Sequence, residues 1–600
     1  MPAQVAGTAV AAPAAACAEA EPRAPRGLYR AVFVLALAAA VVPLWMVRYT
    51  GMLDYTSHLA RCYILAHFYR AAIWQQFYRV EWGPIPNLAM DAIVTPLARW
   101  LPIGVSGKLF LTLTAVLYVS GCEALGRAAW GGRHWMALAA GLTFFNSDLL
   151  DGRVNYIFGL ALVFWVLALW LRVRGRMTGP WFVTFCGLSV IVFLAHLGAA
   201  AVLGVACTVV AVQDWKRHRR AARLAAEVGC LAGPPLLLLF GFLRHNGSVG
   251  PLSWGSWELK ASHLLTFVRT YSAGSELALL VGLALGAAVL VRRAQWRRDL
   301  ALAALVLLGC YAAMPMHLFT ADYADARFVA PGFVLLMIAV RPRPGRWRAL
   351  GVAAVMALLL ARVVLIGHDW METDAEARQV LAMGVKLTPG ARVDVSESTV
   401  GKSGVEGARR LALSRILDMW SVTRGAYMSN VYATRGQQPL VQRPELESCQ
   451  PGEGRHCLAR FDYVVTDGPP ALVEVRLQAG AQAVAQWQTF TLWKVRAQHS
   501  SSSRPSGTAL AAVRRGGGEA EGEHLPGELP ADARPRFAGA AAARAKDEGH
   551  FGRLARLAAR QDLEQNFIAT RVERVELDGI AAKNEKTGHG IGNATERAWQ

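Results

Sequence analysis

Eleven apolar segments, separated by polar loops, dominate the first 366 residues of the chain. Apolar runs of this kind are typical of helices that cross a membrane, which need about 20 residues to span the hydrocarbon core. Several segments are shorter and would have to borrow flanking residues or lie within protein. The predicted spans are near 29–47, 105–125, 133–147, 155–171, 180–195, 197–212, 224–243, 277–291, 299–316, 327–340 and 349–366. The sequence therefore predicts an α-helical polytopic membrane protein with about eleven transmembrane helices.

The charge composition supports a membrane location and argues against nucleic acid as a partner. Only 18% of the 600 residues are charged and 54% are hydrophobic, whereas a soluble domain carries roughly 25% charged residues. The formal net charge of +20 would suit a polyanion. Most of the excess, however, lies in short loops between apolar segments, where Lys and Arg set the orientation of a chain in the lipid bilayer.

The distribution of Lys and Arg predicts that orientation. With the N-terminus in the cytoplasm and the chain alternating sides, the predicted cytoplasmic segments contain 21 Lys and Arg residues. The short external loops contain five, namely Arg153, Arg244, Lys260, Arg269 and Arg327. Because basic residues are enriched on the cytoplasmic side, we expect an N-in, C-out protein in the inner membrane of a bacterium.

The apolar stretch 179–213 is predicted to be a helical hairpin rather than one helix. A single helix of that length would run about 52 Å at 1.5 Å per residue, too long for one crossing. It would also place its two basic flanks on opposite sides of the membrane, against the orientation rule. A turn at His196-Leu197-Gly198 removes both conflicts and places His196 at the external surface.

The membrane part of the chain begins after an Ala- and Pro-rich segment, 1–28, which is predicted to be a disordered cytoplasmic N-terminus. The first apolar segment resembles a signal peptide, but the ten segments that follow favour an uncleaved first helix. The transmembrane domain, 29–366, contains a large first external loop at 48–104. Within that loop, 85–101 is predicted to be an amphipathic helix on the membrane surface.

Residues 367–497 lose the membrane pattern and are predicted to form a small periplasmic α/β domain. Strands are expected at 391–395, 461–465 and 490–495, and helices at 375–383 and 408–419. Cys449 and Cys457 form either a disulfide, if the compartment is oxidising, or two free thiols. Residues 498–600 are low-complexity sequence and are predicted to be largely disordered.

The sharpest group of chemically useful residues follows the first span, in Asp54-Tyr-Thr-Ser-His58-Leu-Ala-Arg61. On a helix, Asp54, His58 and Arg61 fall at i, i+4 and i+7 and share one face. A carboxylate and an imidazole beside a guanidinium suit a general base, or bases, next to an anion-binding group. The alternative is an interfacial helix with Asp54 as its N-cap and a local ion pair.

Other ionisable residues border the spans on the same predicted side. The external turn after the third span holds Asp148 and the candidate binding residues Asp151, Arg153, Asn155 and Tyr156; the other candidates are His196, Lys260, Arg269 and Arg327. Charges this close to hydrocarbon are costly unless they are solvated or paired. Each residue alone suits a solvated turn or an interfacial anchor, but together they indicate a polar site at the external membrane surface. The basic residues of the loop 244–276, Lys260 and Arg269 among them, suit either a phosphate headgroup or anchoring at the interface.

This arrangement resembles the GT-C superfamily of integral membrane glycosyltransferases, which have a cytoplasmic N-terminus and an acidic residue soon after the first span. The match to the first-loop motif is at Asp54, with Tyr55 in place of a second acid. The chain is also similar to bacterial membrane proteins that share the Asp-Tyr-x-x-His-Leu-Ala-Arg element, an Asn-Tyr span start like Asn155-Tyr156, and a Gly-Gln-Gln-Pro stretch like 436–439. The resemblance covers roughly 29–497.

The resemblance implies transfer of a sugar from a polyprenyl-phosphate donor to an acceptor outside the cytoplasm. It implies that Asp54 activates the acceptor hydroxyl, and that Arg61 and Arg327, with Lys260 or Arg269, stabilise the departing lipid phosphate. No cofactor is certain; no spacing resembles a zinc site, and a divalent metal is possible. The alternatives are a transporter or flippase for a lipid-linked or small anionic substrate, and a non-catalytic membrane assembly protein.

Overall fold

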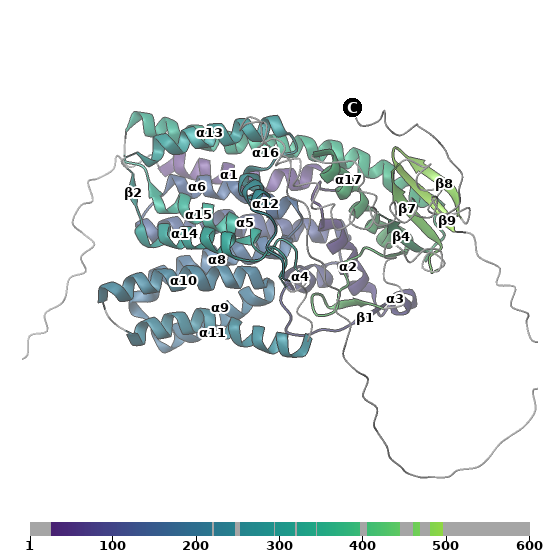
Figure 1. Ribbon diagram of the computed structural model, residues 1–600, viewed down its shortest axis with the longest axis horizontal. Helices are drawn as coiled ribbons and strands as arrows, with labels where there is room; N and C mark the ends of the chain where they lie inside the picture. The colour runs from purple at the N-terminus through teal and green to yellow at the C-terminus, as the bar shows by residue number, and fades with distance from the viewer. Residues whose placement is uncertain are drawn as a thin grey trace, which may run out of the picture.

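The computed structural model describes residues 26–218, 221–246, 252–292, 294–318, 321–343, 345–396, 405–443, 460–468 and 481–495. In these ranges the chain forms a helical bundle with a small mixed sheet at one end (Figure 1). The predicted disordered segment before residue 26, the Cys449 and Cys457 pair, and the tail after residue 495 lie outside the described residues.

Seven helices in the described ranges are long and apolar enough to cross a membrane. They are α1 (Arg26–Met46), α5 (Ile103–Trp130), α8 (Val154–Val173), α10 (Leu197–His218), α11 (Ala221–Asn246), α13 (Ala273–Val291) and α16 (Arg346–Ala382). The other four expected spans contain the shorter helices α6 (Trp135–Gly141), α9 (Gly179–Ala195), α14 (Arg298–Ala313) and α15 (Val329–Ala339). The polytopic helical architecture is confirmed, and the count of eleven spans stays a prediction.

The third expected span, 133–147, is not one continuous helix. After α6, a 3-10 turn covers Leu142–Phe144 and a short helix, α7 (Ser147–Leu150), follows. The Asn146 side chain accepts a hydrogen bond from the N–H of Leu149 and so caps α7, which starts a new helix instead of extending the old one. The segment is buried among its neighbours, which is where interrupted backbone is tolerated at membrane depth.

The predicted hairpin in 179–213 is present. α9 ends at Ala195 and α10 begins at Leu197, with an extended His196 between them. The Nδ1 atom of His196 accepts a hydrogen bond from the N–H of Gly198 at 2.9 Å and satisfies an otherwise unpaired donor at the start of α10.

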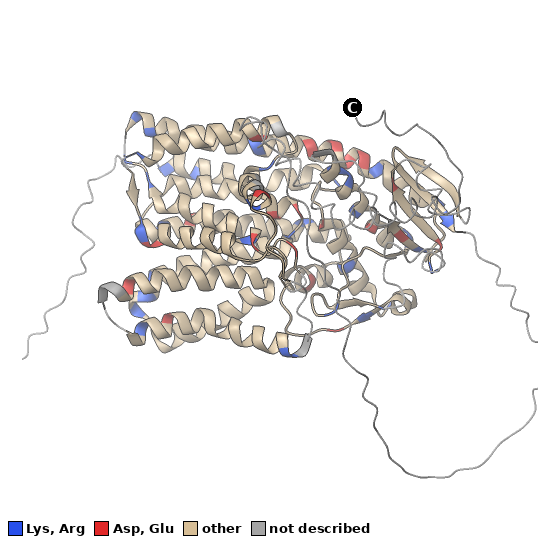
Figure 2. Cartoon of the chain, in the orientation of Figure 1, with Lys and Arg blue, Asp and Glu red and all other residues tan. Residues whose placement is uncertain are grey.

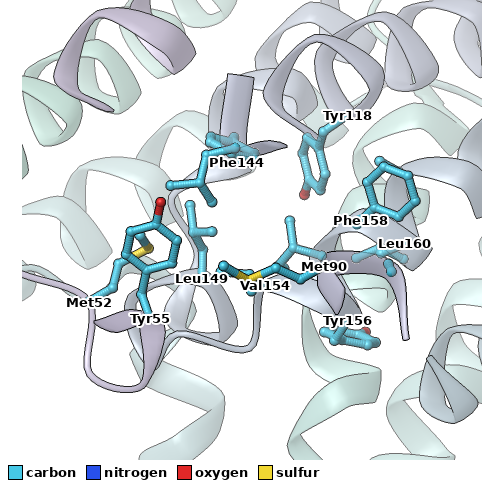
Figure 3. Close-up of a cluster of buried hydrophobic side chains, with 14 of the residues drawn as sticks. Met52, Tyr55, Met90, Tyr118, Phe144, Leu149, Val154, Tyr156, Phe158 and Leu160 are labelled. Atoms are coloured by element: carbon cyan, nitrogen blue, oxygen red, sulfur yellow. The ribbon is translucent and has the colours of Figure 1, made fainter. Parts of the chain in front are cut away.

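Three short helices lie between α1 and α5: α2 (Tyr55–His67), α3 (Ala72–Phe77) and α4 (Ala89–Leu97). The helix expected at 85–101 is present as α4, and it packs against α2, α5 and α8; its place at the membrane surface stays a prediction. Its Asp91 is 0% exposed and points inward to Arg61. Figure 3 shows Tyr55 of α2, Met90 of α4, Tyr118 of α5 and Leu149 of α7 in one apolar cluster.

α5 and α8 pack along each other at the centre of the bundle. A side chain at Gly121 would come within 3.0 to 3.2 Å of Trp165, Phe164 and Ala161, so glycine is what permits this close approach. The outer helices instead turn large apolar side chains outward, such as Leu237 of α11 at 74% exposed and Val364 of α16 at 71%. Outward apolar faces of this size are those expected of helices that contact lipid.

The loops gather at two opposite ends of the bundle. At one end β2 (Gln295–Trp296) pairs with β3 (Val340–Arg341) and Arg297 donates a hydrogen bond to the carbonyl of Ala129. Figure 2 shows Lys and Arg collected at this end. At the other end β1 (Tyr78–Val80) pairs with β6 (Leu440–Gln442), which joins the segment between α1 and α5 to the C-terminal region.

The C-terminal region is built on the end of α16, which runs through residue 367 without a break. Its helices are α17 (Val405–Ile416) and α18 (Trp420–Arg424). The sheet order is β5-β4-β7-β9-β8, with β4 parallel to β5 and β7 and with β9 antiparallel to β7 and β8. The strands are β4 (Arg392–Ser396), β5 (Tyr427–Met428), β7 (Tyr463–Asp467), β8 (Ala481–Trp487) and β9 (Phe490–Val495). We call residues 383–495 the sheet domain.

Candidate active site

Asp54 occupies the N-cap position of α2 but does not cap the helix. Its backbone is near-helical, with φ −94° and ψ −4°, and its side chain makes no capping hydrogen bond. The carbonyl of Asp54 accepts the first helical hydrogen bond, from the N–H of His58 at 3.2 Å. The expected role as N-cap is therefore wrong, and the half-buried carboxylate is directed to other partners.

The turn between α7 and α8 packs directly onto the backbone of Asp54. The N–H of Asp54 donates to the carbonyl of Asp151 at 3.3 Å, and the N–H of Leu53 donates to that of Leu150 at 3.0 Å. This approach depends on Gly152, which has φ +81° and whose added Cβ would lie 2.4 Å from the nitrogen of Asp54. Two loops separated by about a hundred positions in the sequence thus meet at Asp54.

Replacing Gly152 with Ala should move Asp54. A left-handed φ costs a non-glycine residue about 1–3 kcal/mol, and the backbone contact at 2.4 Å cannot relax without displacing α2. We expect Gly152→Ala to lose more thermal stability than Gly131→Ala, because Gly131 has φ +69° but nothing within 4 Å of its added Cβ. Equal losses in the two variants, measured as melting temperatures in detergent, would contradict this contact.

A network of ion pairs lies beside Asp54 and consists of Asp148, Asp151, Arg153 and Arg269. Arg153 donates from Nη1 to Asp148 at 2.8 Å and from Nη2 to Asp151 at 3.2 Å. Arg269 contacts the other oxygen of Asp151 at 3.1 Å. The side chains of Arg153 and Asp151 are each only 15% exposed, and Arg153 interacts electrostatically with Asp54.

Arg362, on α16, holds the backbone of Arg269 and so supports this ion-pair network. Arg362 is 1% exposed, and its Nε donates to the carbonyls of Val268 at 3.0 Å and Arg269 at 3.1 Å. Sequence reasoning missed Arg362, although a charged residue inside an apolar segment is a signal of a buried polar partner.

Arg327 interacts electrostatically with both Arg153 and Asp148. Its Nη1 donates to the carbonyl of Asp322 at 3.2 Å. Its Nε is buried and has no hydrogen-bond partner in the described part of the chain. The Tyr156 hydroxyl donates to the carbonyl of Arg327, and the ring of His196 packs edge-on against Tyr156 at 5.2 Å. Tyr156 and His196 thus support Arg327.

Three residues from the C-terminal region complete the surroundings of Asp54, and sequence reasoning missed all of them. Asn430 and Tyr432 follow the edge strand β5, and Arg415 lies near the end of α17. The Tyr432 hydroxyl hydrogen-bonds the Asp54 carboxylate, and Arg415 acts on that carboxylate electrostatically. The Arg415 guanidinium also lies over the Tyr432 ring, 5.6 Å from its centroid.

The environment of Asp54 brings the pKa of its carboxyl group closer to neutral pH. Burial removes water from the carboxylate and raises the pKa of Asp54 to about 6, against the lowering effects of Arg415, Tyr432 and Arg153. Burial, with the nearby charge of Arg61, holds the pKa of His58 well below its usual value. Asp54 is therefore the titratable acid of this group, and His58 is a neutral imidazole.

His58 is tied to its neighbours rather than to Asp54. Its Nδ1 lies 2.8 Å from Nη1 of Arg61; because an arginine only donates, this nitrogen accepts the hydrogen bond. Its ring stacks on Tyr432 with 5.3 Å between centroids. These contacts favour a supporting role for His58 over the catalytic one suggested by its spacing.

Three other predicted binding residues have their polar groups engaged within the fold. Arg61 is 0% exposed and forms a two-pronged pair with Asp91, at 2.7 and 2.9 Å. Lys260 donates to Asp325 at 2.8 Å and to the carbonyls of Tyr311 and Met314. Asn155 accepts from the N–H of Met90 at 2.7 Å and donates to Asn87, which fixes α4 on α8. The structure thus brings together Asp54, Asp151, Arg153, Arg269 and Arg327. The other three residues, Arg61, Lys260 and Asn155, make contacts that stabilise the fold.

Among the described residues, no three His, Cys, Asp or Glu side chains are close enough together to hold a metal ion. The possibility of a divalent metal stays a prediction of the sequence alone.

No known family model matches the sequence, and no curated protein matches it. Among solved structures, the chain is similar to the crystal structure of ArnT from Cupriavidus metallidurans bound to undecaprenyl phosphate. The two share 13% sequence identity and a TM-score of 0.44, over 78% of this chain and 98% of that one. A likeness at this level assigns no family.

Proposed function

We propose that this protein is a membrane glycosyltransferase that transfers a sugar from a polyprenyl-phosphate donor to an acceptor at the external membrane surface, with Asp54 as the general base. The observation that carries the proposal is the Asp54 carboxylate, which does not cap its helix and has a pKa raised to about 6. A base is most effective when its pKa lies near the working pH. The resemblance of the sequence to the GT-C superfamily supports the substrate class.

The proposed reaction is a direct displacement at the anomeric carbon of the donor sugar. The acceptor hydroxyl gives its proton to Asp54 while its oxygen forms a bond to the anomeric carbon. The bond from that carbon to the phosphate oxygen breaks, and the electron pair leaves with the polyprenyl phosphate. One displacement of this kind inverts the configuration of the anomeric carbon.

Arg327 is the group best suited to the leaving phosphate. The departing phosphate gains negative charge in the transition state, so a fixed donor aimed at it lowers the barrier. Arg61 and Lys260 are excluded from this role because their donors are engaged in the fold. Arg327 retains a buried Nε without a partner among the described residues. Arg269 belongs to the neighbouring ion-pair network through its contact with Asp151.

The rate should depend on pH as the ionisation of Asp54 dictates. Because only the carboxylate can accept the proton, the rate constant should be constant well above pH 6 and fall tenfold per pH unit well below it. The measurement is kcat/KM against pH in proteoliposomes, with insertion checked at each pH. A profile that is flat between pH 5 and 8 would show that Asp54 does not act as the base.

The function is tested by the release of undecaprenyl phosphate, which is a product whatever the acceptor. Donors would be undecaprenyl phosphate linked to glucose, mannose or aminoarabinose, with an extract of native membranes as the acceptor source. We expect the wild-type protein to release lipid phosphate from at least one donor and to label the acceptor fraction. If no donor released lipid phosphate, the proposed transferase function would be rejected and the transporter and assembly roles would remain.

A further inference from the structure

The segment after β5 is fastened to the first turn of α2, immediately beside Asp54. The Ser57 hydroxyl donates to the carbonyl of Asn430 at 3.4 Å and accepts from the N–H of Tyr432 at 3.1 Å. The neighbouring Thr56 hydroxyl donates to the carbonyl of Arg415 at 3.0 Å. The backbone of Asn430 is therefore fixed between the sheet domain and the helix that carries Asp54.

The side chain of Asn430 has no corresponding role in the fold. Both its amide nitrogen and its amide oxygen are buried, and neither has a hydrogen-bond partner in the ranges that the structure describes. An unsatisfied buried amide destabilises a folded protein, because it gives up hydrogen bonds to water and gains none. Buried polar groups are nearly always paired, so an exception calls for a specific explanation.

The surroundings of Asn430 point to a ligand. Tyr432, two positions along the chain, hydrogen-bonds Asp54 and stacks on His58. Arg415 donates to the carbonyl of Asn430 at 3.4 Å and also acts on Asp54. The Asn430 amide offers one group that donates and one that accepts. A hydroxyl group, or two adjacent hydroxyls on a sugar ring, offers the matching pair.

We infer that Asn430 is a substrate-binding residue through which the sheet domain holds a hydroxyl of the carbohydrate substrate beside Asp54. This inference rests on the proposed function and adds to it the domain and the group that recognise the sugar. The hydroxyl belongs either to the acceptor or to the donor sugar, and the kinetics described below distinguish the two.

The test is Asn430→Leu, which keeps the shape of the side chain and removes the amide. Because the amide has no partner to lose, we expect the full-length protein in detergent to melt roughly 1–3 °C higher than the wild type. The matched control is Asn146→Leu. The amide of Asn146 donates to the carbonyl of Thr143 at 3.2 Å and accepts from the N–H of Leu149 at 3.3 Å, so this variant should melt lower.

The kcat/KM of the same Asn430→Leu protein should be about tenfold lower than that of the wild type, the loss expected for one hydrogen bond to substrate. A raised KM for the undecaprenyl-phosphate donor would place the hydroxyl on the donor sugar. A raised KM for the membrane acceptor fraction would place it on the acceptor. A stabilised protein with a slower reaction is the signature of a group kept for binding rather than folding.

Three outcomes would overturn the inference. A lower melting temperature for Asn430→Leu would show that the amide has a partner in the fold. A higher melting temperature with wild-type turnover would show that the amide binds no substrate. Failure of the wild-type protein to turn over any donor would reject the proposed function, and this inference with it, whatever the melting temperatures.

Discussion

Asp54→Asn should reduce the release of undecaprenyl phosphate by about 10²- to 10⁴-fold, the contribution typical of a general base. The amide has the shape of the carboxylate and still accepts a hydrogen bond from Tyr432, so α2 should keep its position. It cannot accept the proton of the acceptor hydroxyl. Steady-state kinetics in proteoliposomes would measure the loss, which should appear in kcat because the base acts in the chemical step.

The matched control for this variant is Asp462→Asn. Asp462 pairs with Arg392 in the sheet domain at 3.0 Å and is 42% exposed, so the substitution makes the same change in charge away from Asp54. We expect Asp462→Asn to retain wild-type turnover. Wild-type turnover by Asp54→Asn, in a protein inserted at normal levels, would remove Asp54 from the mechanism.

The second large effect concerns stability. Arg61 and Asp91 are both 0% exposed, so Asp91→Asn should leave a buried guanidinium without its counter-charge. Breaking a buried pair from one side costs about 3–5 kcal/mol. We expect a loss of this size in the free energy of unfolding, measured by titration with SDS in mixed micelles. The loss should disturb α2 as well, because Arg61 also donates to His58.

A double variant separates the buried charge from the rest of the packing. Arg61→Met with Asp91→Leu removes both charges and replaces them with apolar groups, an exchange that is often neutral. We expect the double variant to be more stable than Asp91→Asn, which is a non-additive result between residues in direct contact. Additive losses would mean that the pair contributes little beyond its individual side chains.

Local patterns in the sequence predicted the elements better than their surroundings. Each of the eleven apolar segments contains a helix in the structure, because membrane-spanning helices carry their hydrophobicity in continuous runs. It could not show that 133–147 breaks at Asn146, since an apolar run looks the same whether lipid or protein covers it. For the same reason, the sequence could not show that α4 packs on α2, α5 and α8, with Asp91 buried against Arg61.

The candidate site was predictable where its residues lie close together along the chain. Helical spacing identified Asp54 and His58 as candidates, and a cluster of charges in the turn after the third apolar segment identified Asp151 and Arg153. Asn430 and Tyr432 were not predictable, because 373 and 375 positions separate them from Ser57, which they contact. No helical or strand period spans such a distance, so only the three-dimensional structure joins them.

The proposed function depends on Asp54 and the sheet domain lying together outside the cytoplasm. Labelling of single cysteines with a membrane-impermeant maleimide in spheroplasts tests this directly, in a background without the nine native cysteines. Suitable positions are Tyr69 in the first external loop, 79% exposed, Arg435 in the sheet domain, with a side chain 77% exposed, and the exposed Arg343 at the basic end. We predict that Tyr69→Cys and Arg435→Cys are labelled in intact spheroplasts and that Arg343→Cys is labelled only after permeabilisation. The reverse pattern would place Asp54 in the cytoplasm and contradict the proposed function.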